Sequence, residues 1–323
     1  MKLRMHKEEK FLEKKREENK VKFNVRHGQL AGMAGLSVIC LFFFSYLPMF
    51  GLILAVKDGN KSLNILQAML QSEWTLQNFV DLVVDEKFWS VLWNTVGLNL
   101  LSLLFNFPAP LIFALLINEV RSKHVRKAVQ TVANFPHFIS WVIFGGIVLA
   151  LTDMTTGVIN PVLEAFGLSS PENPVDLNMP QYFWTKMIIV TVIKNIGWGS
   201  IIYTAAIAGI SPEIYDAAAI DGAGRWTRAV RITIPMIAPT ITIFLLLNIS
   251  RILGNSFEQF YVFQNSANLS KSEVLATYIY STGFTYRNYS TAAAMSFFEG
   301  VISVALLSMG NFISNRLTGR GLF

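Results

Sequence analysis

The hydrophobic residues of this chain fall in long uncharged blocks, whereas a soluble domain spaces them periodically. The first block, residues 32–56, contains 25 residues without a charge. As a helix it would be about 37 Å long, which is enough to cross a bilayer. Five later blocks have a similar character: residues 88–118, 134–151, 183–208, 235–253 and 291–313. The pattern predicts an all-α membrane protein with six transmembrane helices.

The second block is longer than a single level crossing requires. Its 31 uncharged residues would form a straight helix of about 46 Å, yet they are too few for two crossings joined by a turn. Pro108 and Pro110 lie within it, and a proline inside a helix kinks it. We therefore predict one long helix, kinked or tilted, that ends at Glu119.

Composition supports a membrane protein and excludes other classes. Of the 323 residues, 52% are hydrophobic and 15% are charged, whereas a soluble domain carries roughly 25% charged residues. Cys40 is the only cysteine in the sequence, which excludes a scaffold held by disulfides within the chain. Aromatic residues make up 13%, which is too much apolar surface for an intrinsically disordered chain.

The cations are distributed unevenly among the segments between the blocks. Residues 1–30 hold ten Lys or Arg, residues 120–131 hold four, residues 211–235 hold three, and Arg316 and Arg320 follow the last block. The loops on the other side hold five in total. Because cytoplasmic loops are enriched in Lys and Arg, both termini are predicted to be cytoplasmic, as six crossings require.

The sequence divides into a basic cytoplasmic N-terminal segment, residues 1–30, and a six-helix membrane domain, residues 31–323. The basic segment alternates Lys or Arg with Glu and has no small-residue cleavage site, so it does not read as a signal peptide. Two interpretations stay open. The segment is either a helix that lies on anionic lipid or a cytosolic partner, or a solvated helix whose charges only set the topology.

The sequence contains no set of residues that would make a membrane enzyme. None of His6, His27, His124 and His137 is spaced with a second His, Cys or carboxylate as in a metal site. No glycine-rich loop ends in Lys-Ser or Lys-Thr, so the chain does not itself hydrolyse nucleotide in that manner. We expect His137 to be a structural or interfacial histidine where the third helix enters the membrane.

The segment between the fourth and fifth blocks, residues 211–235, reads as two short helices around a turn. Glu213 and Asp216 place negative charge in the first turn, where the helix dipole favours it. Three alanines then favour a helix with a flat face that another surface can approach closely. Gly222 is expected at positive φ in the turn. The loop is suited to docking into a groove of a partner, and the alternative is an amphipathic loop on the lipid headgroups.

This loop resembles the EAA loop of binding-protein-dependent ABC importer permeases. The matching residues are Asp216-Ala217-Ala218, Asp221-Gly222-Ala223 and the terminal Pro235. Asp216 stands where the family usually has glutamate, so the charge is kept on a shorter side chain. Further segments are similar to the branch that carries oligosaccharides and polysaccharide fragments: Trp93-Asn94-Thr95, Asn106-Phe107-Pro108-Ala109-Pro110, Leu116-Ile117-Asn118-Glu119, Phe135-Pro136-His137-Phe138-Ile139-Ser140-Trp141 and Gly197-Trp198.

The resemblance implies the type I ABC importer permease architecture, a transport subunit and not an enzyme. In that family the EAA loop is the coupling helix, which a cytosolic ABC ATPase dimer holds in a cleft. The ATPase binds ATP and Mg, so no cofactor is expected in this chain. The ATPase-coupling residues would be Asp216, Ala217, Ala218, Asp221, Gly222 and Ala223.

The resemblance also implies partners and a location. A second homologous permease subunit would complete a heterodimer, and an extracytoplasmic solute-binding protein would deliver a carbohydrate. The membrane would be the cytoplasmic membrane of a prokaryote.

The substrate path is marked by weaker signals. Polar residues inside predicted spans are functional candidates by default, and a tryptophan can cover the apolar face of a sugar ring. The candidates are Lys194, Asn195, Trp198, Asn248, Arg251 and Glu299. The alternative is structural, because Arg251 and Glu299 could form an ion pair and the asparagines could hydrogen-bond between helices.

Other functions stay open at this point. The coupling motif does not specify the cargo, so a permease of this kind could carry a solute other than a sugar. A self-sufficient channel or secondary transporter would show an internal repeat, and no convincing repeat is visible in the sequence. A membrane-embedded enzyme would need catalytic residues that the sequence lacks.

Overall fold

The computed structural model describes residues 25–59, 64–250, 252–254 and 256–318. Every regular element in these ranges is a helix, as predicted. The chain divides into two compact units, Met1–Ile53 and Leu54–Phe323, which are described separately. Most of the predicted basic segment, together with Arg251 and Arg320, lies outside the described residues.

The described part of the first unit is an apolar helical segment that continues just past the unit boundary. It consists of α2 (Val25–Leu41), η1 (Phe42–Tyr46), α3 (Leu47–Met49) and η2 (Phe50–Val56). Gly28–Val56 is long and apolar enough to cross a membrane. Most of its large hydrophobic side chains are exposed, as expected of a membrane span.

In the second unit, the long second block forms two consecutive helices that continue as one span. After the short α4 (Ile65–Gln71) and α5 (Gln77–Val84), the break at Phe107 separates α6 (Glu86–Asn106) from α7 (Pro108–Asn118). Pro108 lacks an N–H and its ring crowds the carbonyl one turn earlier, which interrupts the helix there. Glu119 is the C-cap of α7. These features agree with the predicted kinked helix and its end.

The predicted third helix, residues 134–151, is not continuous. It is replaced by α8 (Lys123–Phe138) and α9 (Trp141–Leu151), whose axes differ by 102°. Pro136 removes a hydrogen bond from the last turn of α8. Ser140 then starts a new helix, because its hydroxyl accepts a hydrogen bond from the N–H of Ile143 at 3.3 Å.

The predicted fifth helix, residues 235–253, is also corrected. A short helical stretch, α13 (Arg225–Arg228), η3 (Ala229–Thr233) and α14 (Ile234–Met236), is followed after a bend of 67° by α15 (Ala238–Ser250). Two prolines, Pro235 and Pro239, flank this bend, and neither can donate the backbone hydrogen bond of a continuous helix. Four described helices are therefore long and apolar enough to cross a membrane, and the two bent pairs would bring the number to six.

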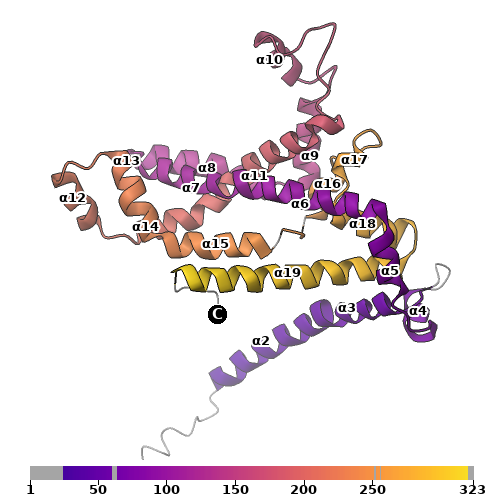
Figure 1. Cartoon of the computed structure of the whole chain (residues 1–323). Coiled ribbons are helices and arrows are strands. Elements are labelled where there is room, and N and C mark those ends of the chain that lie inside the picture. The colour runs from indigo at the N-terminus through magenta and orange to yellow at the C-terminus, as the bar shows by residue number, and fades with distance from the viewer. Residues whose placement is uncertain (1–24, 60–63, 251, 255, 319–323) are drawn as a thin grey trace, which may run out of the picture. The chain divides into compact units, whose positions relative to one another are not determined.

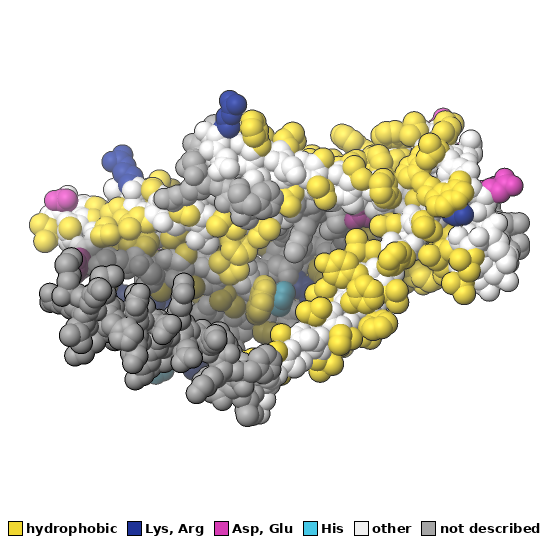
Figure 2. Space-filling view, turned by 90° about the horizontal axis from the view of Figure 1, so that it is seen from below, with side chains coloured by type: hydrophobic (Ala, Val, Ile, Leu, Met, Phe, Trp, Pro, Cys, Tyr) yellow, Lys and Arg dark blue, Asp and Glu magenta, His cyan; other side chains and the backbone are white. Residues whose placement is uncertain are grey.

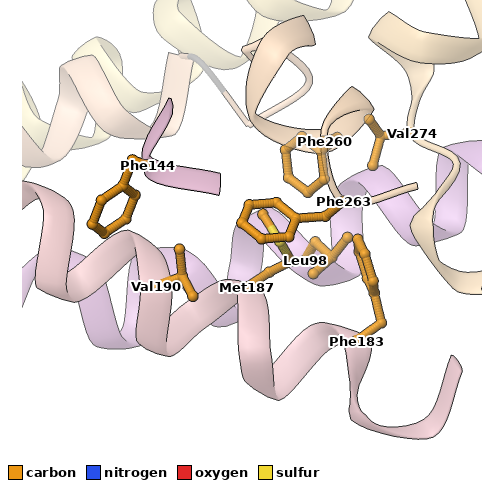
Figure 3. Close-up of a cluster of buried hydrophobic side chains, with 8 residues drawn as sticks. All are labelled: Leu98, Phe144, Phe183, Met187, Val190, Phe260, Phe263 and Val274. Carbon is orange, nitrogen blue, oxygen red and sulfur yellow. The ribbon is translucent and has the colours of Figure 1, made fainter. Parts of the chain in front are cut away.

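The longest central helix, α11 (Pro180–Ala208), packs against α6, α7 and α8, and α15 packs along α19 (Tyr289–Thr318) (Figure 1). Side chains of α6, α9 and α11 meet the segment around α16 (Phe257–Tyr261) in a buried apolar cluster (Figure 3). The cluster contains Leu98, Phe144, Phe183, Met187, Val190, Phe260, Phe263 and Val274. It joins residues that are far apart in sequence and so holds the helices in register.

The two ends of this helical unit carry different elements. One end holds α12 (Pro212–Ile220) and α13, and the other holds α17 (Leu269–Ser272) and α18 (Leu275–Tyr280), which leads into η4 (Ser281–Thr285) (Figure 1). The short α10 (Ile159–Ala165) projects on a long loop. Hydrophobic side chains cover much of the surface in view, and charged ones are few (Figure 2).

Candidate coupling loop and transport path

The predicted loop at residues 211–235 forms a helix that ends in a tight left-handed turn. Pro212 begins α12 after Ser211, and Gly222 has φ +75°, as predicted. The N–H of Ala223 donates to the carbonyl of Ala218 at 2.9 Å, and that of Gly222 donates to Ala219 at 3.1 Å. These two bonds are the Schellman ending of a helix, which needs a positive φ at the glycine position.

The tip of this loop is uncovered. Ile220 is 88% exposed and Trp226 is 81% exposed, and Asp216, Ala217 and Asp221 are exposed as well. Large apolar side chains this exposed, flanked by carboxylates, suit a surface that contacts another protein or lipid. The predicted coupling residues therefore lie on the last turns of α12 and the turn that follows it, with Ala218 and Ala223 partly buried and the other four exposed.

The base of the loop is anchored to the membrane helices. The hydroxyl of Tyr215 lies 2.9 Å from that of Thr233 and hydrogen-bonds with it. Ile214 and Tyr215 also pack on a buried apolar cluster of Ala114, Tyr203, Ile207, Ile210 and Ile237. The base of the loop is therefore packed directly against side chains of α7 and α11.

Lys194, a candidate for the substrate path, has a structural position. Its side chain is 3% exposed, and its ammonium donates to the carbonyls of Pro136 at 2.8 Å, His137 at 3.5 Å and also Ile139. These carbonyls lie at the break between α8 and α9, where the regular helical hydrogen bonds are interrupted. The lysine therefore caps the end of α8, in line with the structural alternative.

Asn195 and Trp198, one turn further along α11, meet His137. The Nδ1 of His137 donates to the Oδ1 of Asn195 at 3.2 Å, and its ring is stacked on Trp198 with centroids 4.6 Å apart. Trp198 is 46% exposed. Phe138 meets the same indole edge-on at 5.8 Å. An exposed aromatic face beside amide and imidazole groups is the combination that binds a sugar ring and its hydroxyls.

The remaining path candidates do not join this group. Asn248 donates to the carbonyl of Phe244 on its own helix at 2.8 Å, and Glu299 lies half-buried on α19. Arg251 is outside the described residues, so its pairing with Glu299 stays a prediction. The sequence predicts a structural or interfacial role for His137. Its contact with Trp198 could not be foreseen, because it depends on the bend between α8 and α9.

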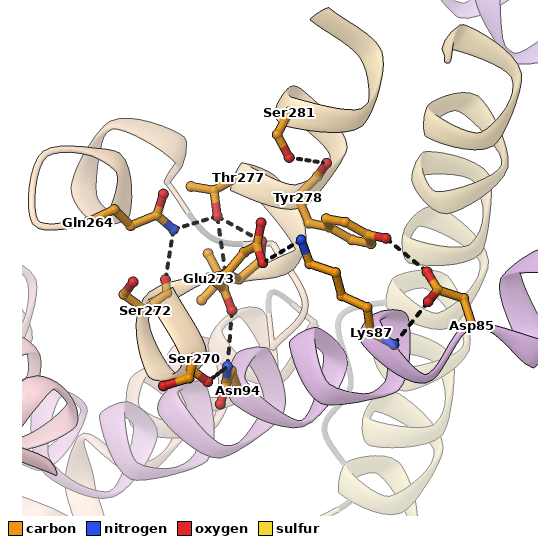
Figure 4. Close-up of polar contacts among 11 residues, drawn as sticks. Asp85, Lys87, Asn94, Gln264, Ser270, Ser272, Glu273, Thr277, Tyr278 and Ser281 are labelled. Atoms are coloured by element: carbon orange, nitrogen blue, oxygen red, sulfur yellow. Dashed lines mark hydrogen bonds and ion pairs between the residues drawn. The ribbon is translucent and has the colours of Figure 1, made fainter. Parts of the chain in front are cut away.

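A polar network joins the start of α6 to the segment before α18 (Figure 4). Lys87 forms an ion pair with Glu273 at 3.2 Å, and the hydroxyl of Tyr278 donates to Asp85 at 2.8 Å. The amide of Asn94 donates to the carbonyls of Ser270 and Glu273 at 2.9 and 3.3 Å. Burial, and then the hydrogen bond to Asp85, raise the pKa of Tyr278. Asn94 thus fastens the segment before α18 to α6.

No group of three or more metal-binding side chains occurs among the described residues. On the projecting loop, the carboxylate of Asp153 accepts hydrogen bonds from the N–H and hydroxyl groups of Thr155 and Thr156 at 2.8–2.9 Å. These bonds, first that from the N–H of Thr156, lower the pKa of Asp153. They close a local turn and bring no other charged group to it.

Residues 93–320 match the family described as the binding-protein-dependent transport system inner membrane component. The chain belongs to this family, and the resemblance first noted in residues 211–235 is confirmed. The family consists of permease subunits of ABC transporters, so the chain is a multi-pass membrane transport subunit and not an enzyme.

The relatives cover most of the chain. Protein LplB of Bacillus subtilis (strain 168) is 38% identical over 281 residues, which are 87% of this chain and 86% of LplB. The polygalacturonan/rhamnogalacturonan transport system permease protein YteP of the same organism is 34% identical over 287 residues, 88% of this chain and 87% of YteP.

A solved structure has the same fold. It is a crystal structure of a bacterial alginate ABC transporter in complex with an alginate pentasaccharide-bound periplasmic protein. One of its chains superposes with a TM-score of 0.81 at 36% identity, covering 92% of this chain and 97% of that one. The predicted type I ABC permease architecture is therefore confirmed.

Proposed function

We propose that this chain is one membrane subunit of an ATP-driven importer that moves an oligosaccharide or polysaccharide fragment into a prokaryotic cell. The proposed cargo rests on one observation. Over 92% of its length, at 36% identity, the chain is similar to a chain of a transporter crystallised with a pentasaccharide-bound periplasmic protein. The name of YteP, also a carbohydrate permease, supports it. A glycerol-3-phosphate permease, UgpA, is more distant at 28% identity, and a non-sugar solute is the alternative cargo.

The proposed topology has six spans with both termini in the cytoplasm of the cell, and the membrane is the cytoplasmic membrane. Four apolar helices and two bent pairs support the count. The uneven distribution of Lys and Arg supports the orientation, because the coupling loop then lies on the same side as the basic N-terminal segment.

The proposed partners follow from the loop and the relatives. A cytosolic ATPase dimer, which binds ATP and Mg, would receive the loop segment formed by Asp216, Ala217, Ala218, Asp221, Gly222 and Ala223. A second permease subunit would complete the pair, and an extracytoplasmic binding protein would deliver the sugar. When ATP draws the two ATPases together, the anchored base of the loop would move α7 and α11 as rigid bodies.

The proposed substrate contact is the face of Trp198. Its stacking on His137 fixes the indole, and Asn195 orients the imidazole in turn. A pyranose ring could cover the exposed indole face while its hydroxyls bond to the neighbouring polar groups. Lys194, Asn248 and Glu299 would affect transport indirectly, by positioning the helices that carry them. Arg251 remains a candidate for the path.

Co-purification followed by an ATPase assay tests this function. The wild type should purify from native membranes with an ATPase and a second permease. Its ATP hydrolysis should increase when a sugar-loaded binding protein is added. A chain that purifies alone and still exchanges solute in vesicles would overturn the importer and favour a secondary transporter. Stimulation by glycerol phosphate, and not by any oligosaccharide, would overturn only the cargo.

A further inference from the structure

A basic cavity lies at the base of the coupling loop, apart from the exposed tip and from Trp198. Its volume is about 380 Å³, and its wall is formed by the end of α7, the start of α8, and residues of α12 and α13. Four arginines contribute to it: Arg121, Arg126, Arg225 and Arg228. Glu119 is the only carboxylate among the residues that line it, so the cavity carries a clear excess of positive charge.

The internal contacts of the cavity leave much of this charge uncompensated. Arg225 pairs with Glu119 at 3.4 Å. Arg126 donates from Nη2 to the carbonyls of Asn118 and Val120, each at 3.0 Å, and thereby caps the end of α7. The Nε atoms of Arg126 and Arg228 are buried and have no hydrogen-bond partner among the described residues. A buried charged donor without an acceptor is costly, and an anion in the cavity would compensate the charge of these two guanidinium groups.

The position of the cavity decides which anion fits. It lies where the span Glu86–Asn118 ends and the bent pair beginning at Arg225 starts, the level at which lipid headgroups lie. Ile112 and Leu116, spaced one turn apart on α7, are 54% and 64% exposed, so the helix that ends at the cavity presents apolar side chains on its surface. Free phosphate would use only the arginines, whereas a phospholipid would use both the basic cavity and the apolar surface.

We propose that this cavity binds the phosphate headgroup of an anionic phospholipid. The guanidinium forks of Arg126 and Arg228 would donate to the phosphate oxygens, with Arg121 adding positive charge. Because Tyr215 of the coupling helix also lines the cavity, a bound headgroup would brace the base of the coupling loop against α7 and α8. Anionic lipid is then expected to strengthen ATPase coupling in the complete transporter, whatever its cargo.

Native mass spectrometry of the complete transporter tests the proposal. The complex is reconstituted in nanodiscs of phosphatidylcholine with a minor fraction of phosphatidylglycerol, and the retained phosphatidylglycerol is measured. Arg126→Gln and Arg228→Gln should each weaken its binding by about tenfold, because each removes a charge-assisted hydrogen bond. Lys127→Gln is the matched control: it removes the same charge from the next residue of α8, an exposed position that does not line the cavity.

Further arms separate the remaining explanations. Arg228→Lys keeps the charge and should retain more lipid than Arg228→Gln, and melting in pure phosphatidylcholine checks that each variant is folded. Equal lipid binding by folded Arg126→Gln, Arg228→Gln and Lys127→Gln would overturn the proposal. Displacement of phosphatidylglycerol by inorganic phosphate at millimolar concentration would assign the cavity to free phosphate, and would overturn the lipid as its ligand.

Discussion

The imidazole of His137 lies parallel to the indole of Trp198, with the ring planes 3° apart and the centroids separated by 4.6 Å. The two residues are 61 positions apart in the sequence. They meet because the α8–α9 pair bends by 102° just after His137. Trp198 nevertheless remains 46% exposed, and the contact connects the proposed path to the bend.

Replacing Trp198 with alanine should weaken sugar transport. Loss of the aromatic face removes a stacking contact worth about 0.5–1.5 kcal/mol, so the KM for transport should rise by roughly two- to tenfold. Trp198→Phe keeps an aromatic face and should behave much more like the wild type. Uptake of labelled oligosaccharide into proteoliposomes measures both variants. An unchanged KM in Trp198→Ala would remove this residue from the path.

Lys194→Met should destabilise the fold while leaving side-chain volume nearly unchanged. The carbonyls of Pro136 and Ile139 would lose their buried donor, at a cost of about 1–3 kcal/mol. Thermal unfolding in detergent gives the effect as a lower Tm. Lys123→Met, at an exposed position of α8, is the control and should change the Tm little. Equal Tm values for the two variants would argue against capping by Lys194.

Gly222→Val should uncouple the ATPase without preventing membrane insertion. The glycine has φ +75°, a conformation that costs an L-residue about 1–2 kcal/mol and more when the residue is β-branched. Gly224→Ala is a matched control two residues away, because Gly224 has φ −66° and open space around its Cα. ATP hydrolysis stimulated by the loaded binding protein should fall sharply only in Gly222→Val. Normal stimulation in that variant would contradict the assignment of the coupling loop.

Gly197→Ala should push α11 away from α8. A Cβ at this position would lie 2.3 Å from the backbone of Ala133 and 2.6 Å from the N of Asn134, so the two helices must separate. Overpacking of this kind costs about 1–3 kcal/mol. Gly146→Ala on α9 meets nothing within 4 Å and should be neutral or slightly stabilising. Melting of both variants tests the close contact, and a Gly197→Ala protein as stable as Gly146→Ala would exclude it.

Stability should decrease at alkaline pH through Tyr278. Its pKa is raised in the folded state by burial and by the hydrogen bond to Asp85, so the folded protein holds the phenol proton more tightly than the unfolded chain. The contribution is complete below the unfolded pKa of about 10 and is lost as the pH rises from there towards the folded pKa. Tyr278→Phe should be less stable than the wild type at neutral pH. Above about pH 10, its Tm should fall less steeply with pH than that of the wild type. Parallel Tm curves for the two proteins would contradict this role.

Several features of the protein follow from interactions between residues that are close together in the sequence. Residues 88–118 are long and uncharged enough to span a membrane, and Pro108 breaks the helix within them. Both effects depend only on residues that are neighbours in the sequence. The turn at Gly222 is equally local, since the alanines propagate α12 and the glycine accepts the positive φ that ends it. The spacing of the two aspartates and Gly222 already resembles the family that residues 93–320 match.

Other features depend on partners distant in the sequence. Lys194 reads as a path residue from its position in an apolar helix, yet its donors meet carbonyls 55–58 residues away that only the bend between α8 and α9 exposes. The stacking of His137 on Trp198 and the cavity of four arginines arise in the same way, from helices brought together in space. The sequence alone determined the membrane class, the blocks and the coupling turn, because length, hydrophobicity and backbone freedom are properties of neighbouring residues. Only the tertiary structure decided which polar side chains serve the backbone and which remain for ligands, because that depends on which helix ends and carbonyls meet them.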